Sequence, residues 1–260
     1  MYTQKSIPFN KSEVHYSIQK SSEKGVVFYH GDGQNHTAGN SILELFPDQY
    51  TKVSIDRPGH GKSPFLTGRT IEKECEILET IVGKEGIKDP VVIGHSSGAV
   101  IAASFAMRNK LQALILLNPF FMNPRKLFWY LPASLLEKMY LNQAKGKHNP
   151  NAPYHIFGNE RSEEDIHREA FVHTPHETLQ QNLALFEGYD VRRNMQHIDV
   201  PILILQSRKG LLSTHSHVRR VCKDIPNVRI ESIDGTHNIH LLSKQEVEEK
   251  IKKNMNFLRL

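Results

Sequence analysis

One stretch of the chain decides the fold: Val91-Val92-Ile93-Gly94-His95-Ser96-Ser97-Gly98-Ala99-Val100-Ile101-Ala102-Ala103. Its first three residues are β-branched, which favours a strand, and its last five are rich in alanine, which favours a helix. Gly-x-Ser-x-Gly between a strand and a helix is typical of a nucleophile elbow, a tight turn that exposes the serine hydroxyl and needs small neighbours. The alternative is a glycine-rich turn whose serine only caps the helix, and the strand–turn–helix context favours the elbow.

Short apolar runs alternate with helical patterns on both sides of this stretch. Runs that are apolar throughout predict strands covered on both faces, as in a parallel sheet, and the first strands follow one another over short links that suit an antiparallel edge. The sequence therefore predicts an α/β fold in which helices cover both faces of a mostly parallel sheet. The predicted strands are residues 6–9, 13–18, 26–29, 52–55, 91–93, 114–117, 202–205 and 228–233, and the predicted helices are 71–82, 99–107, 163–170, 177–186, 218–222 and 247–258.

The alternation stops between residue 119 and about residue 193, where no strand pattern is found. Aromatic residues and prolines cluster at the start of this region, and a polar stretch follows them over residues 142–153. Two helical patterns occur before the strand pattern returns. We interpret the region as a largely helical insertion between two strands, within a single domain that spans residues 1–260.

The composition is that of an ordinary globular protein, with 260 residues, 38% apolar and 23% charged, and a net charge of +5. No block of five or more like charges occurs, so the basic excess indicates solvated lysines and no nucleic-acid partner is expected. The two cysteines, Cys75 and Cys222, lack the spacing of a disulfide framework or a zinc site. No signal-peptide core and no run of 18 apolar residues is found, which predicts a cytoplasmic protein without a membrane span. The pattern carries no signal of oligomeric state.

Three further motifs accompany the elbow in the chain. Val26-Val27-Phe28-Tyr29-His30-Gly31-Asp32-Gly33 is an apolar strand that ends in His-Gly, Asp56-Arg57-Pro58-Gly59-His60-Gly61-Lys62-Ser63 has the form Asp-x-x-Gly-x-Gly-x-Ser, and Thr236-His237-Asn238 follows the last predicted strand. In this order the four motifs resemble the α/β-hydrolase superfamily over nearly the whole chain, in its serine-nucleophile, lid-bearing, esterase- and lipase-like branch. The resemblance implies an eight-stranded α/β-hydrolase fold whose insertion forms a helical lid.

The resemblance also implies roles for individual residues. Ser96 is the nucleophile, and His237 is the base that a serine needs, because the pKa of an unaided hydroxyl is far too high for attack. The backbone amides of Asp32 and Ser97 form the oxyanion hole. His240 follows His237 by three residues, but no carboxylate or cysteine cluster accompanies the pair, so neither a metal nor another cofactor is expected.

The acidic member of a catalytic triad is missing where the resemblance places it. Gly210 stands where an acid follows the penultimate predicted strand, and Asn118 occupies the second position that some branches use, after the preceding strand. Three hypotheses stay open at this point. Asn118 orients His237 as a neutral partner, an acid from elsewhere such as Asp234 or one in the insertion takes the role, or the site is a Ser–His dyad.

The function implied is hydrolysis of a carboxylic ester, or of a related lactone, thioester or amide, through an acyl-enzyme, with a small-molecule acyl substrate. Phe120, Phe121, Trp129 and Tyr130 in the insertion either line an apolar substrate pocket or pack the lid's own core. The alternative is a non-hydrolytic or degenerate member of the fold, which binds a ligand or performs cofactor-free lyase or oxygenase chemistry, because one fold hosts many activities.

Overall fold

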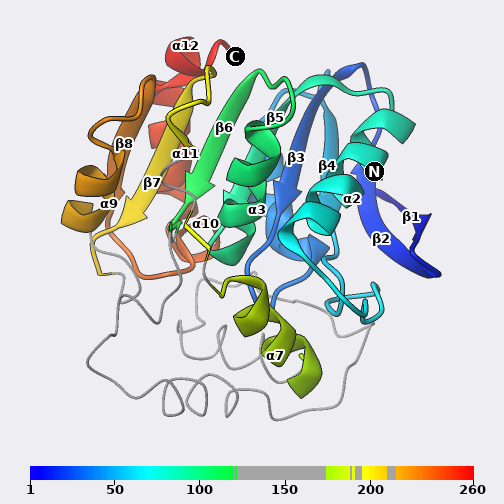
Figure 1. The fold of residues 1–260 in the computed structure, drawn as a ribbon. Helices are drawn as coiled ribbons and strands as arrows, with labels where there is room; N and C mark the ends of the chain where they lie inside the picture. The colour runs from blue at the N-terminus through cyan, green and yellow to red at the C-terminus, as the bar shows by residue number, and fades with distance from the viewer. Residues whose placement is uncertain (120, 122–173, 188, 191–194, 210–214) are drawn as a thin grey trace.

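The computed structural model describes all residues except 120, 122–173, 188, 191–194 and 210–214 (Figure 1). Its centre is an eight-stranded sheet with the strand order β1-β2-β4-β3-β5-β6-β7-β8. The strands are β1 (Thr3–Phe9), β2 (Ser12–Gln19), β3 (Lys24–Tyr29), β4 (Thr51–Ile55), β5 (Lys88–His95), β6 (Ala113–Leu117), β7 (Ile202–Ser207) and β8 (Val228–Ile233).

The sheet is mostly parallel, as predicted. Neighbouring strands from β4 to β8 in this order all run parallel, whereas β2 is antiparallel to both of its neighbours, β1 and β4. The parallel strands end at the same edge of the sheet, the lower edge in Figure 1. The turns that follow β3, β5, β6 and β8 therefore meet at one edge, which is where open parallel sheets place their functional residues.

Helices cover both faces of the sheet (Figure 1). The described helices are η1 (His36–Gly39), α1 (Asn40–Leu43), α2 (Ile71–Lys84), α3 (Ser97–Ala106), α7 (His176–Leu185), α9 (His215–Cys222), α10 (Ile239–Leu242), α11 (Lys244–Lys253) and α12 (Met255–Leu258). Helices α2, α3 and α9 pack into one apolar cluster, and α1, α10, α11 and α12 pack into the cluster on the opposite face. The α/β architecture with two helical layers is thus as the sequence predicts.

Side chains alternate between the two faces along the central strands. In β3, Val27 and Tyr29 join the cluster beneath α2 and α3, while Val26 and Phe28 join the opposite cluster. All four side chains are fully buried. A strand covered on both faces leaves no solvated position for a polar side chain, which explains why the central strands appear in the sequence as unbroken apolar runs.

The C-terminal helix differs from its prediction. The pattern predicts one helix over residues 247–258, but α11 ends at Lys253 and α12 begins at Met255. Asn254 lies buried between them, and its Nδ2 donates to the carbonyl of Lys250 and to the carboxylate of Glu231 on β8. An asparagine side chain that bonds to nearby backbone competes with helical hydrogen bonding, so the helix breaks at this residue.

Much of the predicted insertion falls outside the described residues, and this includes the expected helix 163–170 as well as Phe120, Trp129 and Tyr130. Phe121 is described, and it is buried in the cluster beneath α3. The predicted helix 177–186 is α7, displaced by one residue.

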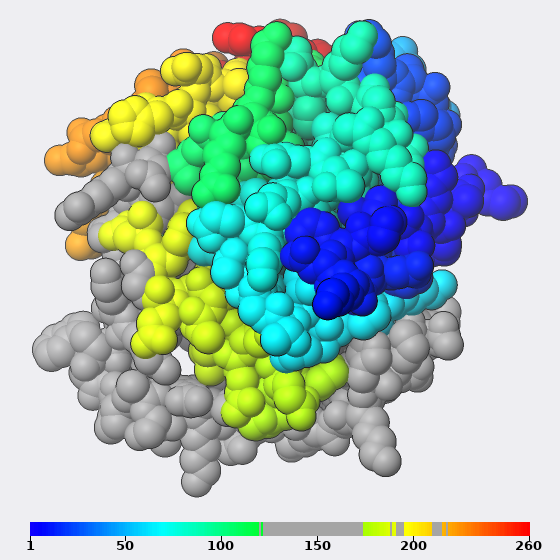
Figure 2. All heavy atoms as spheres, turned by 45° about the vertical axis from the view of Figure 1, so that its right-hand side comes forward, coloured from blue at the N-terminus to red at the C-terminus, as the bar shows by residue number. Residues whose placement is uncertain are grey.

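Helix α7 packs against the segment that joins β4 to α2, shown in cyan above the yellow-green helix in Figure 2. Thr178 Oγ1 donates to the carbonyl of Gly59 at 3.2 Å, and Gln181 Nε2 donates to the carbonyl of Leu66 at 2.9 Å. Gly59 has a φ of +79°, and a Cβ there would lie 2.5 Å from Thr178 Oγ1. A glycine at this position thus allows both the turn and the close approach of the helix.

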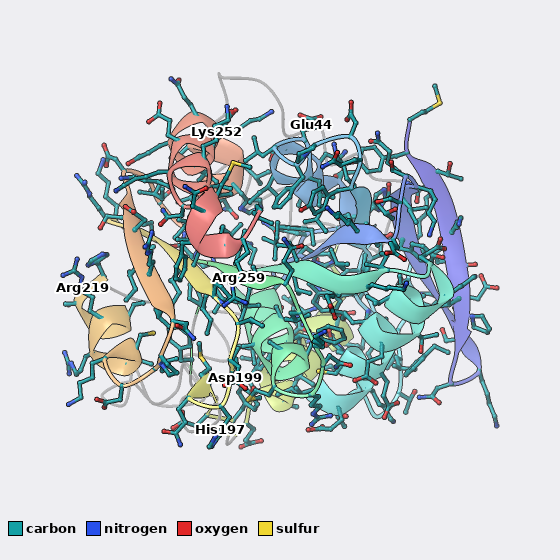
Figure 3. The ribbon with its side chains drawn as sticks, turned by 90° about the horizontal axis from the view of Figure 1, so that it is seen from above. Glu44, His197, Asp199, Arg219, Lys252 and Arg259 are labelled. Carbon is teal, nitrogen blue, oxygen red and sulfur yellow. The ribbon has the colours of Figure 1, made fainter. Side chains whose placement is uncertain are left out.

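Many charged side chains lie on the outside of the molecule. Glu44, Asp199, Arg219, Lys252 and Arg259 are exposed, and Figure 3 shows Arg219 and Lys252 at the periphery of the fold. No helix among the described residues has the length and apolar character needed to cross a membrane. Both cysteines are buried and unpaired.

The start of α3 lies against the end of β3 at very short range. A Cβ built on Gly98 would lie 2.3 Å from the carbonyl oxygens of both Tyr29 and His30, and a Cβ on Gly94 would lie 2.5 Å from Cα of Ala99. Both glycines of the Gly-x-Ser-x-Gly pattern are therefore required by backbone packing around the turn.

Replacing Gly98 by alanine should destabilise the fold, because the added methyl group forces β3 and α3 apart. We expect Gly98→Ala to lower the free energy of unfolding by about 3 kcal/mol, at the upper end of typical overpacking effects, as measured by urea unfolding. Gly83→Ala is the matched control, since a Cβ at this exposed position of α2 meets nothing within 4 Å. That control should gain about 0.5–1 kcal/mol from helix propensity. Equal stabilities of the two variants would contradict the close contact.

Candidate active site

Ser96 occupies the turn between β5 and α3 in a strained backbone conformation. Its φ of 52° and ψ of −118° lie outside the regions that residues with side chains ordinarily adopt. The turn is held by a hydrogen bond from the Ser96 amide to the carbonyl of Leu117 on β6 and by one from the Ala99 amide to the carbonyl of Ser96. This geometry is typical of a nucleophile elbow, and it puts Ser96 at the N-terminal end of a helix, where negative charge is favoured.

His237 reaches Ser96 from the loop between β8 and α10. Its Nε2 lies 2.8 Å from the Oγ of Ser96, across 141 residues of sequence. A neutral ring that accepts the serine proton at Nε2 carries its own proton on Nδ1. The structure thus brings together the two residues expected to act as nucleophile and base, at a distance that suits proton transfer.

The loop after β3 lies against the nucleophile. A Cβ built on Gly31 would come within 3.0 Å of the Cβ of Ser96 and 2.9 Å of Nδ1 of His95, so a side chain there would force these neighbours to shift. Asp32 is the next residue of this loop, and Ser97 is the first residue of α3. The two residues expected to form the oxyanion hole therefore adjoin Ser96, one in the loop and one in the helix.

Asn118 follows β6 and acts on the backbone of the His237 loop. Its Nδ2 donates to the carbonyls of Thr236 (3.1 Å) and His237 (2.6 Å), and its Oδ1 accepts from the amide of Ser207 (2.7 Å). These two bonds use both hydrogens of Nδ2. The asparagine therefore contacts the backbone that carries the His237 ring, and an orienting role for Asn118 stays a prediction.

Asp234, the second group considered as an orienter, is engaged elsewhere. Its carboxylate lies 3.4 Å from the Nζ of Lys209, and its side chain is 62% exposed. Gly210, where the resemblance places an acid, lies outside the described residues. In the structure, therefore, neither Asn118 nor Asp234 forms a hydrogen bond to the imidazole ring of His237.

His95 and Gln34 join the elbow to the two loops beside it. His95 contacts the carbonyl of His237 through Nε2 and the Oε1 of Gln34 through Nδ1, each at 3.1 Å. The same Oε1 accepts from the amide of Gly31, and Nε2 of Gln34 donates to Oδ1 of Asn238, each at 3.0 Å. Sequence analysis missed Gln34, and the signal that could have found it is its place three residues after the glycine of the His-Gly motif.

His240 lies behind His95 and is fully buried. The ring centroids of the two histidines are 4.2 Å apart, and Phe28 packs against the other side of His240 at 5.7 Å. Neither ring nitrogen of His240 has a hydrogen-bond partner in the described part of the chain. Burial, followed by the charges of His237 and His30, lowers the pKa of His240 to about 3. The ring is therefore neutral, and the described residues contain no group of three or more histidines, cysteines or carboxylates that could hold a metal.

Comparison with known proteins identifies the family. Residues 20–242 match the Hydrolase_4 family, whose description is serine aminopeptidase, S33. The chain belongs to this family. Membership of Hydrolase_4 agrees with the eight-stranded sheet and confirms the resemblance to α/β-hydrolases.

The individual relatives of this Hydrolase_4 member are distant. A serine hydrolase-like protein from Danio rerio is 23% identical over 89% of this chain and 81% of its own length. A dihydrolipoyllysine-residue acetyltransferase component of an acetoin cleaving system from Cupriavidus necator is 34% identical over 36% of this chain, a match that spans 25% of that protein. The enol-lactonase from Burkholderia xenovorans LB400 shares the fold with a TM-score of 0.76 at 20% identity, covering 98% of this chain and 100% of that one.

In this Hydrolase_4 chain, the Asp-x-x-Gly-x-Gly-x-Ser segment builds the turn after β4. Buried Asp56 accepts hydrogen bonds from the amide and the Nδ1 of His36, at 2.7 and 2.9 Å, and a Cβ on Gly61 would lie 2.3 Å from its Oδ1. Ser63 Oγ closes the turn by donating to the carbonyl of Asp56 at 2.7 Å. Arg57 is the exception, because its guanidinium points to the loop after β3 and lies 3.2 Å from Oδ1 of Asp32.

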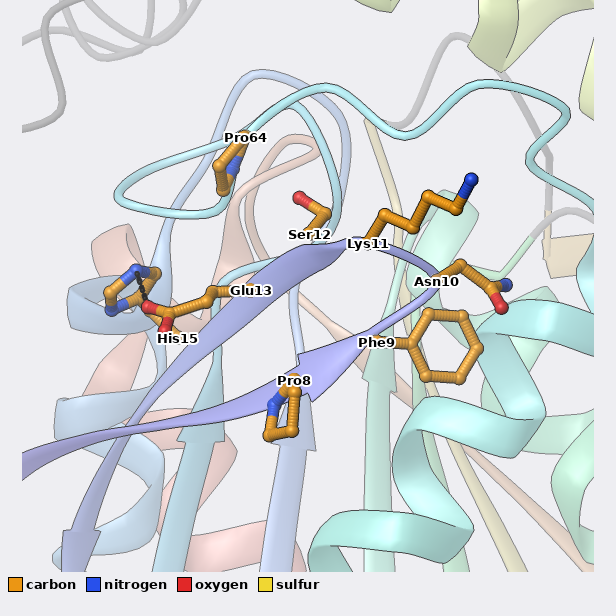
Figure 4. Close-up of a pocket in the computed structure, with 8 residues that line it drawn as sticks. All are labelled: Pro8, Phe9, Asn10, Lys11, Ser12, Glu13, His15 and Pro64. Atoms are coloured by element: carbon orange, nitrogen blue, oxygen red, sulfur yellow. Dashed lines mark ion pairs between the residues drawn. The ribbon is translucent and has the colours of Figure 1, made fainter.

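A shallow groove opens at the turn between β1 and β2 (Figure 4). Its lining residues are Pro8, Phe9, Asn10, Lys11, Ser12, Glu13, His15 and Pro64. Two strands, β4 and β3, separate β2 from β5, which carries the elbow. The groove is therefore set apart from Ser96 and His237 and does not serve the chemistry that these residues suit.

Replacing Asn118 by aspartate tests how this residue acts. We expect Asn118→Asp to lower kcat/KM for an aryl ester about tenfold or more, because a carboxylate oxygen would repel the carbonyls of Thr236 and His237. Aspartate tolerates the residue's φ of 45°. Asn118→Ala is the control that removes the bonds without adding charge, and it should lose less activity. Higher activity in Asn118→Asp would instead show that this position serves as a missing triad acid.

Replacing His240 by leucine should reduce the pH dependence of stability. Since the pKa of His240 falls from 6.5 to about 3 on folding, the unfolded chain binds a proton there between these values and the folded chain does not, so stability falls as the pH drops below 6.5. Urea unfolding at pH 7.5 and 5.5 should show a loss about 1.4 kcal/mol smaller in His240→Leu than in the wild type. Phe28→Leu removes packing from the same ring without removing its titration, and it should keep the wild-type difference. An unchanged difference in His240→Leu would count against the buried neutral ring.

Proposed function

We propose that this α/β-hydrolase is a serine hydrolase of carboxylic esters or related acyl compounds, acting through an acyl-enzyme. One observation carries the proposal: the Nε2 of His237 lies 2.8 Å from the Oγ of a serine whose backbone is strained. Strained φ and ψ values persist where the surrounding structure holds them, and they cluster at functional sites. Here the strain directs the hydroxyl toward a base rather than into a helix cap, since Ser96 makes no capping bond to α3.

The reaction proceeds in two halves. Ser96 Oγ attacks the acyl carbonyl while His237 takes its proton, and the tetrahedral oxyanion accepts hydrogen bonds from the amides of Asp32 and Ser97. Collapse of this intermediate breaks the bond to the leaving group, which receives the proton from His237. Water, activated by the same histidine, then attacks the acyl-enzyme and releases the acid and free Ser96. No cofactor takes part in these steps.

Fixed placement of His237 is the main demand of this mechanism, and backbone bonds supply part of it. The carbonyl of His237 accepts from Asn118 Nδ2 and lies 3.1 Å from His95 Nε2. These contacts come from the ends of β6 and β5, two rigid neighbouring strands. A ring held through its own backbone loses little freedom on binding substrate, which favours catalysis.

The family supports the reaction class, and the insertion is where substrate choice is expected. The names serine hydrolase-like protein and enol-lactonase describe relatives of this chain and fit acyl chemistry. We propose that the insertion at 119–193 acts as a lid and that Phe120, Trp129 and Tyr130 bind the acyl group, whereas Phe121 packs in the core cluster beneath α3. A small-molecule acyl substrate follows from this arrangement.

A fluorophosphonate probe tests the proposal without knowledge of the substrate. We expect one phosphonyl group per chain by intact mass, located on Ser96 by peptide mapping. Ser96→Ala should take up none, and His237→Ala should label at least about 10³-fold more slowly, in keeping with the loss of a catalytic base. Ser104→Ala, a buried serine on the same helix, is the matched control and should label like the wild type. A folded wild-type protein that takes up no label would overturn the serine mechanism.

A further inference from the structure

The two residues proposed to form the oxyanion hole are joined through their side chains. Ser97 Oγ donates to Oδ1 of Asp32 at 2.6 Å, although the residues stand 65 positions apart. Ser97 is fully buried, and Asp32 keeps 15% of its side chain exposed. The backbone amides are the groups that would contact an oxyanion, so a bond between the side chains links the two halves of the hole without occupying it.

Arg57 binds both of these side chains with a single nitrogen. Its Nη1 donates to Ser97 Oγ at 2.6 Å and to Oδ1 of Asp32 at 3.2 Å, and it also reaches the carbonyl of His30 at 3.3 Å. His30 begins the loop and Asp32 lies within it, so the guanidinium holds the loop at two points and the first residue of α3 at a third. The amide of Arg57 adds a fourth bond, to Nε2 of His30 at 3.1 Å.

Arg57 is itself fixed by Glu74 on α2. Glu74 accepts from Nε of Arg57 at 3.0 Å and from its Nη2 at 3.3 Å, which is the two-pronged geometry that sets the plane of a guanidinium. Tyr29 and Arg69 each donate to the same carboxylate at 2.6 Å. Burial acts to raise the pKa of Glu74, but the charges of Arg57 and Arg69 outweigh it and lower the pKa to about 2. The group is therefore ionised at neutral pH.

Stability alone does not account for this cluster. Arg57 and Glu74 have no exposed surface, and they share the interior with the guanidinium of Arg69. Removing a charge from water costs several kcal/mol, and apolar side chains of similar volume often stabilise a fold as well or better. Unlike apolar side chains, the side chains of this cluster form hydrogen bonds of defined direction. Those of Arg57 hold Asp32 and Ser97, the two residues beside the nucleophile.

The cluster also reaches α7. Asn182 Nδ2 donates to Oδ1 of Asp32 at 2.9 Å, and Asn182 Oδ1 accepts from Nη1 of Arg69 at 2.6 Å. Asn182 is 1% exposed and thus belongs to the buried network. Helix α7 lies within the predicted insertion, so one carboxylate oxygen connects the loop after β3, the start of α3 and a helix of the insertion.

We infer that Arg57, Asp32 and the Ser97 hydroxyl, anchored by Glu74 and Asn182, form a positioning network that sets the separation of the two oxyanion-binding amides. This inference rests on the proposed function. It assigns a role to side chains that never touch the substrate. Loosening the network should weaken binding of the transition state while leaving binding of the ground state unchanged.

Ser97→Ala is the sharpest test, because it keeps the amide and removes only the hydroxyl that bridges Arg57 and Asp32. Ser104→Ala is the matched control, since Ser104 is also buried in α3 and hydrogen-bonded, to the carbonyl of Val100 and to the hydroxyl of Tyr189, but lies outside the network. We expect Ser97→Ala to lower kcat/KM for an aryl ester by roughly 10- to 100-fold, less than the roughly 10²–10³ that follows loss of an oxyanion donor. Ser104→Ala should stay within about twofold of the wild type.

Inhibitor binding separates positioning from general loosening. A trifluoromethyl ketone forms a tetrahedral adduct with the serine, and its inhibition constant should rise by the same factor as kcat/KM falls in Ser97→Ala. The matching methyl ketone, which resembles the ground state, should bind both proteins equally. Equal weakening of both ketones, or a Ser97→Ala protein that behaves like Ser104→Ala, would overturn the inference.

Asn182→Asp provides a second variant, in case Ser97→Ala does not fold. It keeps the acceptor for Arg69 and puts a carboxylate oxygen where Nδ2 met Asp32, so repulsion should produce the same split between the two ketones. Unchanged affinity for the trifluoromethyl ketone in this variant would count against the network. A wild-type protein that neither labels with the phosphonate nor turns over esters would reject the proposed function itself, whereas an active wild type with normal Ser97→Ala and Asn182→Asp variants would reject only the network.

Discussion

The close contact between the start of α3 and the end of β3 is the constraint on which the site depends. Gly98 lies against the carbonyls of Tyr29 and His30, which leaves no room for any side chain. This contact brings the loop after β3 beside the elbow, so that Gly31 meets Ser96. If the elbow lay further from β3, Ser96 and His237 could still meet, but the loop after β3 would no longer lie beside them. Close packing of the backbone thus determines how Ser96 and the loop after β3 lie relative to each other.

The turn after β4 also supports the candidate active site. Asp56 is surrounded by hydrogen-bond donors, and it fixes the direction in which the chain leaves the sheet. Arg57 comes next, and so its guanidinium enters the interior between α2 and α3, where Glu74 receives it. The Asp-x-x-Gly-x-Gly-x-Ser motif therefore does two things. Asp56 fixes the turn, and because Arg57 is the next residue, the fixed turn directs its charged guanidinium into the interior.

Sequence patterns predict those elements of this molecule whose structure depends on residues that are neighbours in the chain. Apolar runs such as that of β3 indicate buried strands, and Gly94 to Gly98 indicates the elbow, since each signal lies within a few neighbouring residues. The break at Asn254 does not follow from the apolar pattern, because it depends on side-chain bonds of Asn254 to the carbonyl of Lys250 and to Glu231 on another element. For the same reason the order of motifs suggests His237, but it does not reveal that Asn118 bonds to the carbonyl of His237 rather than to its ring. Glu74 and Asn182 carry no sequence signal of their own, because their roles arise from contacts with residues far along the chain.

His237 follows β8, a strand that among the described strands pairs with β7 alone and keeps most of its residues partly exposed. Its partner Ser96 lies on β5, near the middle of the sheet, and 141 residues of chain close the loop between them. Closing a loop of that length costs chain entropy before the contact is made, and local stability varies across a native structure. We expect the proposed catalytic pair to form only when both β5 and β8 are in place. For that reason, the reactivity of Ser96 reports complete folding more sensitively than the helix and strand content of the chain does.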